Sequence, residues 1–158
     1  MRLLAYKGKS WISKIIKRFT RSPYSHVALE LGNGEVWEAW HKGGVVKRTN
    51  YHYGHTPGTH IDVFVIDGEV DEAVVRDLAS RVEGEDYGFS NVFRFGTRAP
   101  AKKDGTWFCS HLVLHLVYFG GVTLLNTIEN YDQMSPRDVL LSPLLTYETS
   151  KITMETGK

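Results

Sequence analysis

Three side-chain types in this sequence could together form a nucleophilic catalytic site: a thiol, an imidazole and a carboxylate. Cys109 is the only cysteine, and it stands near the start of the apolar segment WFCSHLVLHLVYF, which predicts a buried helix bounded by Gly120-Gly121. Thr106 is the predicted N-cap of this helix. In a first helical turn, unpaired N–H groups and the helix dipole favour the thiolate, the reactive form of cysteine. Cys109 is therefore the candidate nucleophile, with a buried structural thiol as the alternative.

A cysteine nucleophile needs an imidazole partner, and that imidazole needs an acceptor on its other nitrogen. His26 lies near the start of a predicted strand over residues 24–31, and Glu38 lies on a second predicted strand over residues 35–40. The intervening Gly32-Asn33-Gly34 is a strong hairpin signal. A hairpin that turns there brings His26 beside the Glu38 region, and the register decides whether the two side chains share a face. The sequence thus predicts a triad of thiol, imidazole and carboxylate.

His111 and His115 raise an alternative, a zinc site, because a spacing of four residues places both on one helical face. A third ligand would have to come from the loop at residues 51–55, and no adjacent glutamate completes a metalloprotease motif. Hydrogen-bonded helical histidines are the commoner outcome, so the sequence predicts no metal and no cofactor. The loop histidines are interpreted as polar groups that could line a cleft: His52, His55 and His60.

The elements that position these residues follow from periodicity and turn signals. Ser10 is the predicted N-cap of an amphipathic helix that ends near residues 21–23, and residues 49–60 read as a long surface loop. No structure is predicted over residues 86–95. Further strands are predicted at residues 2–7, 45–46 and 61–66, a helix at 71–82, and a short peripheral helix within 134–140. This order predicts one α+β domain over residues 1–148 and a flexible tail over residues 149–158.

Composition excludes several classes of protein. A chain of 158 residues with 42% hydrophobic residues can build one substantial core. Its net charge of +1 provides no overall field toward nucleic acid, and a single cysteine cannot form an intramolecular disulfide. The N-terminal segment does not read as a signal peptide, and no window approaches the length of a transmembrane helix. We therefore expect a cytoplasmic protein without a membrane-spanning segment.

A basic helix face and a set of aromatic residues are interpreted as structural features and not as binding sites. The basic residues Lys14, Lys17, Arg18 and Arg21 are predicted to form the solvated face of one helix, so no nucleic-acid partner is expected. Four aromatic residues would suit an acyl chain but are predicted to belong to the core: Trp11, Phe19, Trp37 and Trp40.

The ordered motifs resemble a known family. The segment YSHVALELGNGEVWEA, followed far downstream by FCSHLV at the start of a helix, resembles the circularly permuted branch of the NlpC-type papain-like hydrolases, the YiiX/YebB-like proteins. Three further segments resemble that family in the same order: residues 8–14, Tyr87-Gly88-Phe89 and residues 135–139. The resemblance covers most of the chain. It implies a permuted papain-like fold in which the nucleophile helix packs on an antiparallel sheet that carries the histidine.

The resemblance also implies roles for individual residues. Cys109 would be the nucleophile, His26 the base and Glu38 the residue that orients the imidazole. Tyr24 matches a family tyrosine near the site and is taken as a candidate substrate-binding residue. The family often has a glutamate where this chain has His111, so the substrate does not carry over directly.

We therefore expect a cysteine hydrolase that cleaves an amide or ester bond. Through the resemblance alone, the favoured activity is a peptidase or amidase acting on peptidoglycan-type peptides. Two alternatives stay open: a lipid hydrolase or acyltransferase of the lecithin:retinol acyltransferase type, and a non-catalytic module that binds a peptide or lipid on the same fold. The expected partner is accordingly a small peptide-like or lipid-like substrate.

Overall fold

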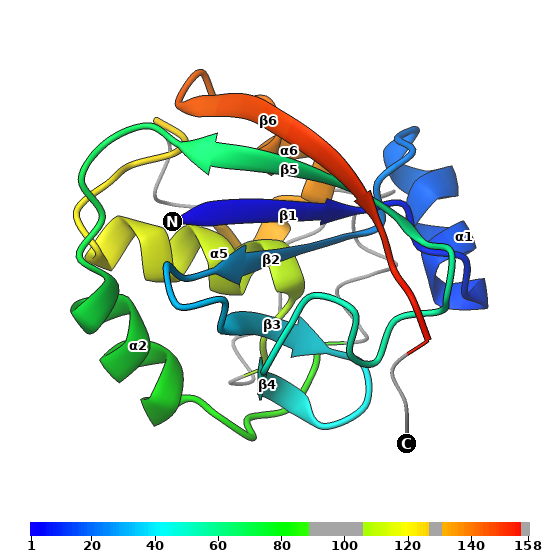
Figure 1. Cartoon of the computed structure of the whole chain (residues 1–158), viewed down its shortest axis with the longest axis horizontal. Coiled ribbons are helices and arrows are strands. Elements are labelled where there is room, and N and C mark those ends of the chain that lie inside the picture. Colours follow the sequence, from blue (N-terminus) through cyan, green and yellow to red (C-terminus); the bar gives the residue numbers. More distant parts are fainter. Residues whose placement is uncertain (89–105, 127–130, 156–158) are drawn as a thin grey trace.

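A six-stranded antiparallel sheet organises the computed structural model, which describes residues 1–88, 106–126 and 131–155 (Figure 1). The strand order is β4-β3-β2-β1-β5-β6. The strands are β1 (Arg2–Tyr6), β2 (His26–Glu30), β3 (Val36–Trp40), β4 (Gly44–Arg48), β5 (His60–Ile66) and β6 (Leu145–Ile152). The helices are α1 (Trp11–Thr20), α2 (Glu72–Arg81), α5 (Cys109–Phe119) and α6 (Pro136–Val139), with a 3₁₀ turn η1 at Tyr131–Gln133. The predicted α+β class is confirmed.

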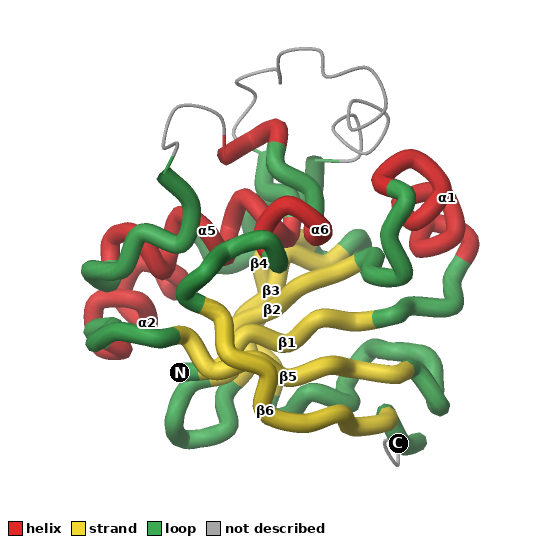
Figure 2. The backbone as a smooth tube through the Cα atoms, turned by 90° about the horizontal axis from the view of Figure 1, so that it is seen from above, coloured by secondary structure: helices red, strands yellow, loops and turns green. Residues whose placement is uncertain are grey.

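The two faces of the sheet are buried by different partners. Residues such as Val27, Leu29 and Trp37 join the main core with α5, which packs against β2 and β3. Figure 2 shows α5 and α6 on the same side of the sheet. The other face carries a smaller apolar cluster that includes Tyr6 and Ala28, with Tyr51 of the 49–60 loop packed against it. Because side chains alternate along a strand, successive residues of β2 face the main core and the smaller cluster in turn.

Local capping explains where the first two helices begin. Ser10 caps α1, its hydroxyl accepting a hydrogen bond from the Ser13 N–H at 3.2 Å, as predicted. Asp71 caps α2 by accepting from the N–H groups of Ala73 and Val74. None of the described helices has the length and apolar character needed to cross a bilayer.

The hairpin between β2 and β3 forms as predicted. Leu29 pairs with Trp37 and Glu30 pairs with Val36, and the Leu31 N–H donates to the Glu35 carbonyl at 2.8 Å to close the turn. Gly34 has a φ of 82°, a value that a glycine adopts without strain.

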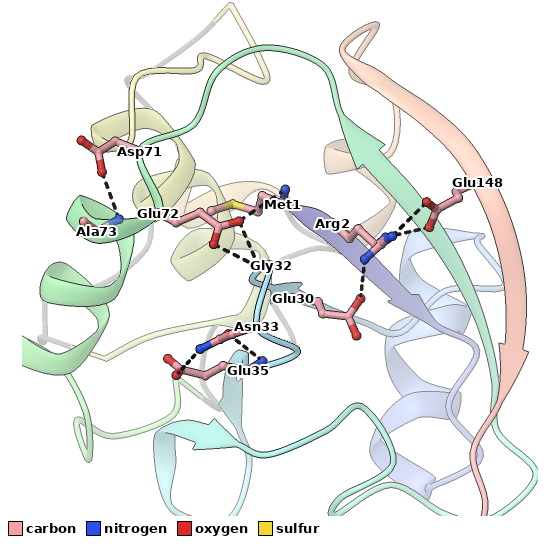
Figure 3. A network of polar contacts seen from close by, with 10 residues as sticks. All are labelled: Met1, Arg2, Glu30, Gly32, Asn33, Glu35, Asp71, Glu72, Ala73 and Glu148. Atoms are coloured by element: carbon pink, nitrogen blue, oxygen red, sulfur yellow. Dashed lines mark hydrogen bonds and ion pairs between the residues drawn. The ribbon is translucent and has the colours of Figure 1, made fainter.

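Contacts from outside the hairpin hold its turn in place. Both carboxylate oxygens of Glu72, the first residue of α2, accept from the Gly32 N–H at 3.0 Å (Figure 3). The same carboxylate lies 3.4 Å from the Met1 ammonium at the start of β1. Glu72 therefore links the turn, the central strand and α2, which fixes the hairpin relative to the rest of the sheet.

Two sequence predictions at element ends are wrong. Helix α5 begins at Cys109 with Phe108 as N-cap, not after a cap at Thr106. The cause is a long-range contact: Trp107 forms an isolated bridge with Tyr87, which keeps the chain extended until Phe108. At the other end of the chain, the predicted flexible tail is ordered strand through Ile152, because β6 pairs with β5. Its mostly exposed side chains give β6 little apolar alternation from which a strand could be predicted.

Candidate active site

His26 and Glu38 meet on the face of the sheet that carries Tyr6 and Ala28, and His26 stands at the start of β2, near Cys109 at the start of α5. Because Glu30 pairs with Val36, regular alternation places His26 and Glu38 on that same face, two positions apart across the strands. The imidazole Nε2 lies 2.7 Å from the Glu38 Oε2. The register that the sequence left open thus brings the predicted imidazole and carboxylate into hydrogen-bond contact.

Glu38 is the centre of a buried polar network. Its side chain has no exposed surface, and its Oε1 accepts from the Arg48 Nε at 3.1 Å while its Oε2 also lies 3.2 Å from the His55 Nε2. Burial opposes ionisation of this carboxyl, yet hydrogen bonds from His26 and His55 hold the pKa of Glu38 well below its usual range. Glu38 is therefore a carboxylate at neutral pH.

Cys109 is close enough to His26 to influence its ionisation. Burial alone would lower the pKa of His26, but Cys109 and Glu38 together raise that pKa to about 10. The imidazole is thus under the influence of both the thiol and the Glu38 carboxylate. Cys109 has no exposed surface, so the site must open for a reactant to reach the sulfur.

The backbone around Cys109 suits a developing negative charge. Cys109 is the first residue of α5, and within the described residues its N–H donates to no protein acceptor. The first four N–H groups of a helix lack partners in the helix itself, and they attract anions. An oxyanion formed at the sulfur would therefore find a backbone donor at the helix N-terminus.

A pocket of about 240 Å³ opens beside His26. One wall comes from the start of α1 and the segment before it, a second from the end of β3, and a third from the 49–60 loop. Among the described residues, its lining mixes apolar surface with two lysines and several hydroxyl groups and includes no carboxylate: Lys9, Ser10, Ser13, Lys42, Thr56 and Thr59 contribute, with the aromatic rings of Tyr6 and Trp40.

A comparison with solved structures identifies the fold. No family model matches the chain, and no curated protein matches it. The crystal structure of metalloprotein YiiX from Escherichia coli O157:H7 matches with a TM-score of 0.66 and 19% sequence identity, covering 95% of this chain and 96% of that chain. This chain has the YiiX fold. The resemblance found in the motifs is confirmed at the level of the fold.

Two residues that the sequence analysis did not place in the triad complete the site of this YiiX-like chain. The orientation of Arg48 follows from strand alternation. Arg48 on β4 pairs with Val36 on β3, so its side chain faces the same side of the sheet as Glu38. His55 belongs to the long loop, and its ring stacks on Tyr6 with centroids 3.9 Å apart. Burial is the main cause that lowers the pKa of His55, so this imidazole is neutral at neutral pH and donates its Nε2 proton to Glu38.

The remaining predicted residues lie elsewhere on the YiiX fold. Tyr24 borders neither of the two pockets at His26; its hydroxyl donates to the Asp62 carboxylate at 2.6 Å, and burial together with this contact raises the pKa of Tyr24 to about 12. A substrate-binding role for Tyr24 stays a prediction. His111 and His115 pack around Trp107. In the loop at residues 51–55, considered as the source of a third zinc ligand, His55 contacts Glu38 and His52 accepts from the Met154 N–H.

Proposed function

We propose that this protein is a cysteine hydrolase that cleaves an amide or ester bond, with Cys109 as nucleophile, His26 as acid and base, and Glu38 as the residue that orients His26. One observation carries the proposal: the His26 Nε2 lies 2.7 Å from the Glu38 Oε2, and Cys109 is close enough to raise the pKa of the same imidazole. A nucleophile, a base and an orienting acceptor in series are the parts that covalent acyl transfer needs.

The proposed reaction has two halves. The Cys109 thiolate attacks the carbonyl carbon, and the Cys109 N–H stabilises the oxyanion that forms. His26 then gives its proton to the leaving amine or alcohol, which departs as a thioester forms. In the second half, neutral His26 takes a proton from water as the water attacks the thioester, and the tetrahedral intermediate then collapses to the acid product and the Cys109 thiolate, which leaves the thiolate and the His26 imidazolium as at the start. Glu38, with Arg48 and His55 around it, keeps the imidazole in one orientation throughout.

The fold and the substrate are part of the same proposal. We interpret the YiiX fold of this chain as a permuted papain-like fold, in which histidine precedes cysteine in the sequence. The motif resemblance favours peptides of the peptidoglycan type as substrates. The pocket adds a chemical preference: Lys9 and Lys42 without a lining carboxylate suit a substrate that carries an anionic group near the scissile bond.

Thiol alkylation tests the ion pair without knowledge of the substrate. At pH 6, iodoacetamide should label Cys109 of the wild type roughly 10–100-fold faster than Cys109 of His26→Ala, because in the proposed mechanism only the wild type has an imidazole that can take the thiol proton. Mass spectrometry of the intact protein measures the rate. The exposed His60 serves as a matched control, and His60→Ala should label like the wild type. Labelling that follows an ordinary thiol pKa of about 8.5 in all three proteins would contradict the proposed function.

A second candidate function, binding of a divalent metal, is favoured by a specific group of ligand atoms. His26, Glu38 and His55 each offer one atom, and these atoms lie within 4.8 Å of one another. Two imidazoles and a carboxylate are a common zinc donor set, although ligands of a tetrahedral zinc ion lie about 3.3 Å apart and the 2.7 Å contact of His26 would have to lengthen. The YiiX structure is that of a protein described as a metalloprotein. When bound, such an ion would act as a Lewis acid and would occupy His26 Nε2.

Calorimetry with zinc alone tests this candidate. We expect one equivalent to bind to the wild type and His55→Ala to weaken binding by at least about tenfold, because a carboxylate and one imidazole remain. His52→Ala is the control, since His52 Nδ1 accepts from the Met154 N–H and lies outside the ligand group. Equal binding by all three proteins, or none, would exclude a metal site at these residues.

A further inference from the structure

Helix α1 carries an apolar strip that the core covers only in part. Trp11 is 67% exposed and Phe19 is 44% exposed, and Ile15 between them is partly buried against the main core. The spacing of four residues places the three side chains in one row along the helix. The prediction that Trp11 and Phe19 belong to the core is therefore wrong, whereas Trp37 is fully buried as predicted.

A separate row of α1 residues supplies the contacts with the core. Ile12, Ile16 and Thr20 are buried and anchor α1 to the rest of the chain. At 100° per residue, the exposed strip lies directly beside this buried row. The apolar sector of α1 is thus wider than the part that packs against the core, and the rest of the sector faces solvent.

Cations flank the exposed strip on its other side. Lys14 and Arg18 are exposed, and Lys17 and Arg21 continue the basic face. Within the described residues none of these four forms an ion pair. The sequence contains no acidic residue before Glu30, so no neighbouring carboxylate on this segment neutralises the face. The basic face is therefore available to an external anion.

We propose that α1 docks this protein onto the surface of an anionic membrane, with Trp11, Ile15 and Phe19 inserted among the headgroups and the basic face against lipid phosphates. Aromatic and aliphatic residues on one face with lysine and arginine beside them are typical of helices that lie in a membrane interface. The cations select an anionic surface by charge complementarity. An aliphatic side chain at the centre of the strip favours lipid over nucleic acid, which would use flat rings for stacking.

The pocket beside His26 lies on the other side of α1 from the exposed strip. Ser13, which lines the pocket, projects about 160° away from Ile15 around the helix. The docking itself does not depend on the proposed hydrolase function, because it uses none of the three proposed triad residues.

Vesicle sedimentation tests the docking. The wild type should bind vesicles that contain phosphatidylglycerol and should bind vesicles of phosphatidylcholine alone at least about tenfold more weakly, since each cation near an anionic surface strengthens binding on the order of fivefold. The double variant Trp11→Ser, Phe19→Ser and the double variant Lys14→Gln, Arg18→Gln should each reduce binding to the anionic vesicles by about tenfold or more. Salt at about 1 M, where the Debye length falls to about 3 Å, should release the protein.

The control removes an equally exposed apolar pair elsewhere. Leu141 and Met154 are 68% and 64% exposed, and Leu141→Ser, Met154→Ser should bind vesicles like the wild type. Circular dichroism checks that every variant is folded. Wild-type protein that fails to bind anionic vesicles, or loss of binding in the control pair alone, would overturn the proposal. So would tighter binding to a short DNA or RNA duplex that the α1 variants abolish. Iodoacetamide labelling of Cys109 should be unchanged in the α1 variants, so failure of docking and failure of the hydrolase function are distinguishable.

Discussion

Cys109→Ala is expected to abolish the hydrolysis of an activated ester, 4-nitrophenyl acetate, with a loss of roughly 10⁴-fold or more in turnover. The reason is that no acyl-enzyme can form without the sulfur, and removal of the nucleophile from a covalent hydrolase leaves only the contributions of binding and of the oxyanion donor. Rapid mixing should show a burst of nitrophenol in the wild type, and mass spectrometry should detect the acetyl group on Cys109.

The same experiment distinguishes a triad from three independent residues. His26→Ala should lose nearly as much activity as Cys109→Ala, and the double variant should lose no more than either single variant, because thiol and imidazole act as one unit. His60→Gln, at an exposed position on β5, should retain the wild-type burst. A burst that persists in Cys109→Ala, or losses that simply multiply in the double variant, would refute the proposed mechanism.

The hairpin was predictable because its signals are local. Glycines on both sides of Asn33 give the turn, and apolar and β-branched residues give the flanking strands. Whether Glu38 faces His26 was not predictable, since a slip of one residue reverses the face of a whole strand. In the structure the turn is also held from outside: the Glu72 carboxylate, forty residues downstream of Gly32, accepts from the Gly32 N–H. Such a contact leaves no periodic trace in the sequence.

Other parts of the site escaped prediction for the same physical reason. The start of α5 depends on the bridge between Tyr87 and Trp107, which is a tertiary contact, so an attractive N-cap residue at Thr106 is bypassed. His55 reaches Glu38 from a loop whose path follows no repeat. The exposure of Trp11 could not be predicted for a different reason. Amphipathic spacing identifies an apolar sector of a helix, but it does not indicate how much of that sector the core covers.

Glu38→Gln is expected to lower the free energy of unfolding at neutral pH by about 3–5 kcal/mol. The substitution nearly preserves shape but removes the buried negative charge that faces the Arg48 guanidinium and the His26 imidazolium, and removal of one member of a buried charged group carries a cost of this size. Urea denaturation followed by circular dichroism measures the difference. Glu148→Gln is the matched control: Glu148 accepts from Arg2 at 2.7 Å on the surface, and its loss should change stability little.

The stability difference between wild type and Glu38→Gln should also depend on pH in one direction. The pKa of Glu38 is lower in the folded protein than in the unfolded chain, so folding favours the ionised carboxylate. This stabilisation is complete above the unfolded glutamate pKa of about 4.3 and is lost as the pH falls toward the folded value. The wild type should therefore lose stability below about pH 4 more steeply than Glu38→Gln, and the two curves should converge. Parallel curves would mean that Glu38 has the same pKa in both states, which would contradict the network that His26, His55 and Arg48 build around it.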